Sequence, residues 1–207
     1  MINAGFTKNI QSFLISHQID LFREYSKYIE SSFQKELTFY EDGAKKVQEE
    51  EEEDYWDFYL DDVIQYSKDF PRIMRNSLFV SIYTFLEDKI VELCVPNEST
   101  LLKLSDIKGQ GIEQASLYLK KVLLLDFPDN SKEWHYIRKA NLIRNCIVHS
   151  NGVISKSRSK DKLVKAIDEM SFVTKDHNGH INLESQFCLE FLENVHSFLR
   201  QLYKIDN

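Results

Sequence analysis

Residues 131–152, SKEWHYIRKANLIRNCIVHSNG, combine a helical pattern of apolar residues with a basic and polar end. The apolar residues recur at the spacing of one helix face, which predicts a helix that packs on a core. Asn130, with Glu133 three positions later, predicts a capped start for this helix. The Asn-Gly pair at 151–152 tolerates left-handed backbone and predicts that the helix ends just before it.

Helical periodicity also covers most of the remaining chain. It predicts helices over residues 7–47, 71–95, 112–127 and 184–204. Pro71 suits the first turn of a helix, so a new helix is expected to begin there. Residues 112–127 are apolar almost all round, which predicts a helix at the centre of the core. Together these elements predict an all-α fold, a helical bundle with a long N-terminal helix.

A small β-hairpin is predicted between the helix at 131–150 and the last helix. Residues 171–174 and 180–183 flank an Asn-Gly turn, the pattern of a tight hairpin. His177 and His180 lie at this turn without the Cys, His or paired carboxylates that would complete a four-ligand set. We therefore expect turn polarity here, and no metal site.

Composition places the chain among globular proteins. Its 207 residues are 43% hydrophobic and 29% charged. We expect residues 1–62, an amphipathic helix and an acidic segment at 49–54, and residues 63–207, a helical core, to form one continuous unit. The three widely spaced cysteines lie in apolar runs, which favours buried free thiols. Because no apolar run reaches a membrane span and the N-terminus lacks signal-peptide features, a cytoplasmic location is expected, with no membrane partner and no cofactor.

Charge is distributed unevenly along the chain. The net charge is −7, but residues 1–62 hold 6 Lys/Arg against 15 Asp/Glu, whereas residues 131–165 hold 9 against 2. A polyanion responds to the local potential, so the balance of +7 over 131–165 makes this region a candidate nucleic-acid surface. A solvated, lysine-rich loop is the alternative. The candidate RNA-binding residues are Arg138, Lys139, Lys156, Arg158, Lys160 and Lys162.

Arg144, Asn145 and His149 form a candidate catalytic set. Histidine exchanges protons near neutral pH, and a guanidinium is a permanent forked donor to phosphoryl oxygens. Arginine and histidine near a helix end also simply complement the helix dipole, which is the alternative. Asn145 and His149 share a helix face, but Arg144 and His149 lie about 140° apart around the axis. Either Arg144 reaches around the helix, or a second copy of the chain completes the site.

The pattern Ile137-Arg138-x3-Leu142-Ile143-Arg144-Asn145-x3-His149-x2-Gly152 resembles the motif of the HEPN superfamily. The core helix at 70–94 and the closing helix also resemble that family. The resemblance implies a helical bundle that dimerises with its motifs facing each other, forming a shared active site. In one HEPN subgroup a tyrosine lies two residues after the histidine, whereas this chain has Asn151, so control through that tyrosine is not expected.

The same resemblance implies a metal-independent endoribonuclease of a toxin or antiphage-defence type, with an antitoxin or defence-system protein as a possible partner. His149 is then a general acid or base, Arg144 stabilises the phosphorane, Asn145 positions the substrate, and the product is a 2′,3′-cyclic phosphate. The alternative is a non-catalytic module that binds RNA, a nucleotide or a protein. A purely structural helical protein is the third possibility.

Overall fold

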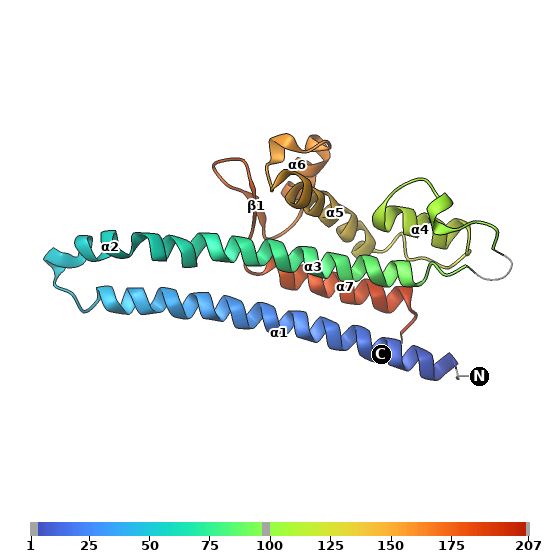
Figure 1. Ribbon diagram of the computed structural model, residues 1–207, viewed down its shortest axis with the longest axis horizontal. Coiled ribbons are helices and arrows are strands. Elements are labelled where there is room, and N and C mark those ends of the chain that lie inside the picture. Colours follow the sequence, from blue (N-terminus) through green and yellow to red (C-terminus); the bar gives the residue numbers. More distant parts are fainter. Residues whose placement is uncertain (1–3, 97–99, 206–207) are drawn as a thin grey trace.

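A long helical hairpin and a compact helical layer make up the molecule. The computed structural model describes residues 4–96 and 100–205. Figure 1 shows α1 lying antiparallel to the continuous α2–α3 rod, with α7 beside them and α5 and α6 on the opposite side of α3 from α1. The helices are α1 Ala4–Ala44, α2 Glu52–Ile64, α3 Phe70–Glu92, α4 Gly111–Lys121, α5 Lys132–Ser150, α6 Lys160–Glu169 and α7 Phe187–Leu202. The all-α prediction is confirmed.

The first helix packs through one face, as its periodicity predicts. Ile15 and Ile19 are buried, and the ring of Phe22 meets that of Phe85 on α3 at 6.0 Å. Polar contacts hold the same side, since the Arg23 guanidinium donates to Glu193 on α7 at 2.7 Å. The acidic residues at 49–54 are exposed in a 3-10 turn and the start of α2. They occupy the far end of the hairpin (Figure 1).

Pro71 lies in the first turn of α3, as predicted, but α3 does not start a separate rod. The helix passes through this residue from α2 into α3, with a π turn over Gln65–Asp69 just before it. Within the π turn the N–H of Phe70 donates to the carbonyl of Gln65, five residues back. A proline ring in a regular α-helix clashes with the carbonyl four residues earlier, and a wider turn relieves that clash. The rod therefore continues, and Pro71 is buried within it.

The predicted helix over 112–127 ends early. Helix α4 stops at Lys121, and the N–H groups of Leu123 and Leu125 turn back to the carbonyls of Tyr118 and Leu119. Leu124 takes a positive φ of 52° and is 81% exposed. The chain leaves the helix here and buries Phe127, whose ring lies 4.9 Å from Trp134. Aromatic packing therefore overrides the local helical pattern.

Helix α5 begins and ends close to its predicted limits, but with a different N-cap. Ser131, not Asn130, caps the helix, because its hydroxyl accepts the N–H of Trp134 at 3.1 Å. At the other end Asn151 adopts the left-handed conformation with φ 48° and ψ 39°, as its type predicts. The N–H of Gly152 donates to the Cys146 carbonyl at 3.1 Å. Both ends are thus satisfied by short-range contacts.

The predicted hairpin is confirmed, and it braces the segment that follows α5. Strand β1, Val173–Lys175, pairs antiparallel with β2, Ile181–Leu183. The Asp176 carboxylate accepts the N–H groups of two turn residues, which stabilises the turn and lowers the pKa of this carboxyl. The N–H of Ile154 donates to the carbonyl of Gly179 at 3.1 Å, which ties the segment to the hairpin.

The core is aromatic at the contact of α3 with α7. The ring of Phe79 lies 5.0 Å from Phe187 and 4.9 Å from Phe191. The three cysteines are buried free thiols, as predicted, and burial raises the pKa of Cys188 to about 12. Helix α5 contacts α7, α6 and α3, so the helix is held from several sides. Among the described residues, no helix combines the length and apolarity that a membrane crossing requires.

Candidate active site

A cleft of about 940 Å³ lies between residues 141–150 of α5, helix α3, the start of α4 and the loop after α5. Its size is at the upper end of ordinary ligand pockets. Its walls therefore come from segments that are as much as about 75 positions apart in the sequence. The lining residues are Tyr83, Glu87, Gln110, Gly111, Ile112, Asn141, Leu142, Arg144, Asn145, His149, Ser150, Lys156, Ser157, Arg158 and Ser159.

Arg144 lies half-buried in this cleft. Its guanidinium carbon stands 5.4 Å from the centre of the Tyr83 ring, a cation–π contact. One terminal nitrogen donates to the Asn145 amide oxygen at 3.1 Å, while the buried Nε has no hydrogen-bond partner. Among the described residues no carboxylate forms a salt bridge with Arg144. A fixed positive charge in this setting favours an anionic ligand.

Asn145 is oriented by a short chain of amides. Its nitrogen donates to the Asn141 side-chain oxygen at 3.1 Å, one helical turn earlier, so its oxygen faces Arg144. His149 is exposed at the end of α5 and lines the same cleft. One chain therefore brings Arg144, Asn145 and His149 to a common space despite the 140° offset. The α5 residues that line the cleft are spread over more than one side of the helix, so both Arg144 and His149 reach it.

Sequence reasoning missed the contribution of α3. Tyr83 and Glu87 are one turn apart and form the opposite wall. Burial, and secondarily the Glu87 carboxylate, raises the pKa of Tyr83, while Arg144 acts in the other direction, so the phenol stays neutral. Two polar residues at i and i+4 on an otherwise apolar helix face were the available signal.

Glycine allows the start of α4 to approach Glu87 closely. Gly111 has a φ of +58°, and a Cβ placed on it would lie 2.8 Å from a Glu87 carboxylate oxygen. The carboxylate of Glu87 therefore lies beside the start of α4, and a helix N-terminus is a favourable neighbour for a negative charge.

Two predicted RNA-binding residues reach the cleft. Lys156 and Arg158 line it from the loop between α5 and α6. The Ser150 hydroxyl donates to the Lys156 carbonyl at 3.4 Å, which links this loop to the end of α5. In the described part of the chain neither side chain forms a salt bridge with a carboxylate. With Arg144 they give the cleft three permanent positive charges against one carboxylate, Glu87.

The other predicted RNA-binding residues lie outside the cleft. Arg138, Lys139 and Lys162 line an adjoining hollow of about 420 Å³ that shares Asn141 and Leu142 with the cleft. Two are already paired there: Arg138 with Glu113, and Lys139 with Glu169, each at 2.8 Å. The Lys139 ammonium lowers the pKa of Glu169 by its hydrogen bond.

Lys160 lies elsewhere again. It lines a smaller hollow of about 270 Å³ between α6 and the hairpin turn, together with apolar residues such as Val164 and Ile167. The basic residues predicted from sequence are thus divided among three surfaces. No group of three or more His, Cys, Asp or Glu side chains suited to a metal ion occurs among the described residues.

Fold and cleft together define an all-α protein with a long helical arm and a polar, mainly basic cleft at the motif helix. No family model matches the chain, and neither the curated proteins nor the solved structures contain a match to it. The cleft is therefore the feature that bears most directly on function.

Proposed function

We propose that this protein is a metal-independent endoribonuclease of the HEPN type, acting at the cleft around Arg144. The observation that supports this best is an arginine that no carboxylate of residues 4–96 and 100–205 pairs with, sharing one cleft with the imidazole of His149. An unpaired guanidinium suits a phosphoryl group, and imidazole suits proton transfer. Lys156 and Arg158 add positive charge for the flanking phosphates.

The proposed reaction is transesterification at one phosphodiester. The ribose 2′-oxygen attacks phosphorus, its proton passes to a base, and the bond to the leaving 5′-oxygen breaks as that oxygen gains a proton. His149 serves as the base or as the acid, and solvent at this exposed end of α5 supplies the other transfer. Arg144 stabilises the charge of the phosphorane. The products are a 2′,3′-cyclic phosphate and a 5′-hydroxyl.

The adjoining hollow offers a path for the rest of the RNA strand. Asn141 and Leu142 border both the cleft and the hollow, so a strand leaving the scissile position meets Arg138, Lys139 and Lys162 next. The Lys139–Glu169 pair is exposed, so its exchange for a phosphate contact costs little. On this proposal, substitution of Lys162 weakens RNA binding without affecting the chemical step.

The test is cleavage of structured and unstructured RNA by purified protein in the presence of EDTA. We expect products with 2′,3′-cyclic phosphate ends, and no cleavage of an RNA that carries 2′-deoxyribose at the scissile position. Arg144→Ala and His149→Ala should each lower the rate at least about 100-fold, the usual contribution of a charge stabiliser or a general acid–base residue. The matched control is His177→Ala, an exposed histidine on the hairpin turn outside the cleft.

Equal cleavage by the wild type and both cleft variants contradicts the proposal. RNA binding that depends on Arg144 but yields no product identifies a non-catalytic binding module at the same cleft. Filter binding at several salt concentrations measures that property separately, because phosphate contacts weaken as salt rises.

A further inference from the structure

Helix α1 presents a second apolar face that nothing in the described chain covers. Six large side chains on this outer stripe expose between 44% and 70% of their surface. His17 continues the stripe, with its ring stacked on Phe13 at 5.9 Å. The six residues of the outer stripe are Ile10, Phe13, Leu14, Leu21, Tyr25 and Tyr28.

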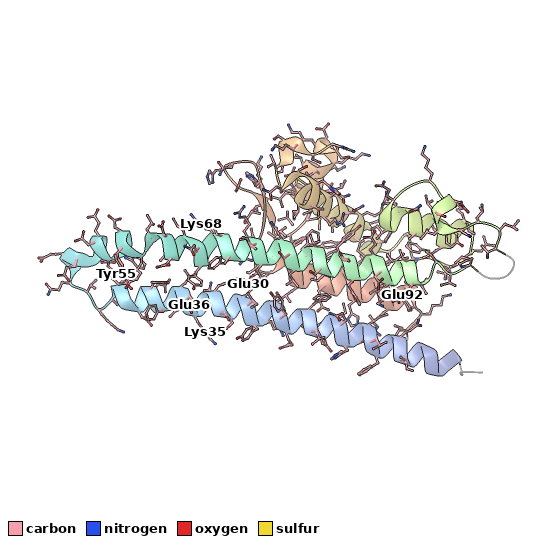
Figure 2. The ribbon with its side chains drawn as sticks, in the orientation of Figure 1. Glu30, Lys35, Glu36, Tyr55, Lys68 and Glu92 are labelled. Atoms are coloured by element: carbon pink, nitrogen blue, oxygen red, sulfur yellow. The ribbon has the colours of Figure 1, made fainter. Side chains whose placement is uncertain are left out.

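The outer stripe lies well away from the packed face of α1. At 100° per residue Leu21 is about 120° from Ile15 and roughly 160° from Arg23, which contacts α7. Tyr28 and Lys35 are seven residues apart and so share a side of the helix. Figure 2 shows Lys35 on the side of α1 that faces away from α2, whereas Glu30 lies between the two long helices. The stripe is therefore open to a partner.

The exposed area matches one half of a protein interface. The six side chains leave on the order of 700 Å² uncovered, if a large side chain has about 200 Å². One partner of a standard interface contributes about 800 Å², whereas the largest apolar patch of a typical monomer is about 300–600 Å². A membrane surface is disfavoured as the occupant, because residues 1–62 hold 15 Asp/Glu against 6 Lys/Arg.

The stripe is complementary to itself when two copies run antiparallel. About a two-fold axis at Leu21, Leu14 of each copy lies opposite Tyr28 of the other, and His17 lies opposite Tyr25. Parallel pairing would place the exposed acidic residues at 49–54 of both copies side by side. Antiparallel pairing sends these two acidic ends in opposite directions, which removes that repulsion.

We infer that two copies of this chain associate along the outer stripe of α1, antiparallel, with the two-fold axis at Leu21. Helices α5 and α6 lie on the other side of α3 from α1 (Figure 1), so the dimer leaves each cleft open. The inference does not depend on the proposed function. The end of each helical hairpin, at residues 45–54, then extends past the N-terminal end of the other copy's α1.

Sedimentation velocity and cysteine cross-linking test this dimer. We expect twice the monomer mass for the wild type and for Gln34→Glu, an exposed control position on another side of α1. Leu21→Glu should raise the dissociation constant of the dimer at least tenfold. It should leave the helical circular dichroism and the rate of RNA cleavage unchanged. Leu21→Cys should form an interchain disulfide under mild oxidation, because the native cysteines are buried.

Phe39→Cys distinguishes the two orientations. In the antiparallel dimer the two residues at position 39 lie roughly 50 Å apart and cannot cross-link, whereas in a parallel dimer they are adjacent. A monomeric wild type, a dimer that survives Leu21→Glu, or cross-linking through Phe39→Cys would overturn the inference.

Discussion

Arg144 is the residue whose surroundings carry the most functional information. Several arginines and lysines among the described residues form salt bridges with carboxylates, as Arg75 does with Glu30 at 2.6 Å and Arg138 does with Glu113. Arg144 instead rests on an aromatic ring and an amide oxygen. These contacts hold the side chain in place without neutralising its charge, which is the arrangement expected of an anion-binding group.

His196 on α7 predicts a pH dependence of stability. Burial lowers the pKa of its imidazole below the ordinary value of about 6.5, with Arg200 and Arg23 acting in the same direction and Glu193 and Asp20 opposing them. The unfolded chain therefore binds a proton more readily than the folded protein. The free energy of unfolding should fall as the pH drops through about 6.5, and level off below the folded-state pKa.

Urea unfolding at several pH values checks this dependence. His196→Gln should reduce the loss of stability between neutral and mildly acidic pH, because it removes the group that titrates differently in the two states. An identical pH profile for the variant and the wild type would show that His196 contributes nothing to it.

Helix ends followed local sequence where short-range contacts satisfy them, and departed from it where packing intervened. Asn151 ends α5 as its residue type predicts. By contrast, the chain turns away after α4 at Leu124, which takes a positive φ although leucine does not favour one. Pro71 signals a helix start in isolation, yet the π turn before it lets one rod continue. A shift of one residue in the α5 cap, from Asn130 to Ser131, lies within the precision of such patterns.

The cap of α5 predicts a loss of stability. Ser131→Ala removes the hydroxyl that accepts the Trp134 N–H, and should lower the free energy of unfolding by about 1 kcal/mol. Asn130→Ala is the matched control, because the adjacent residue is exposed and does not cap the helix, and it should change stability by less than about 0.5 kcal/mol. Chemical denaturation measures both, and equal effects would contradict the assignment of the cap.

The cleft and the outer stripe lie on different sides of the molecule. The cleft lies on the α5 and α6 side of α3, and the outer stripe belongs to α1 on the other side (Figure 1). The acidic residues at 49–54 immediately precede Tyr55, which Figure 2 labels at the end of the two long helices that lies far from α5. This arrangement allows association through α1 without obstruction of the cleft.

Mixed variants test whether one chain holds a complete site. Arg144 and His149 line the same cleft of one chain, so a complex of Arg144→Ala with His149→Ala subunits should remain as inactive as either variant alone. The shared active site that the HEPN resemblance implies predicts the opposite, because one composite site of the mixed dimer would keep both residues. Co-expression with two different tags yields the mixed complex, and the RNA assay measures its activity.

Residue patterns within a few positions of the chain were sufficient to predict the helices α1, α3, α5 and α7, the hairpin and the buried thiols. They did not predict helices over α2 or α6, and they extended α4 too far. They were not sufficient to place Tyr83 and Glu87 opposite Arg144, since these residues are some 60 positions away and meet only through packing of α3 on α5. The same holds for the basic residues, which are close in sequence but fall on three surfaces. Which charges share a cleft is set by long-range packing, because a helix and the loops that follow it distribute neighbouring residues over different faces.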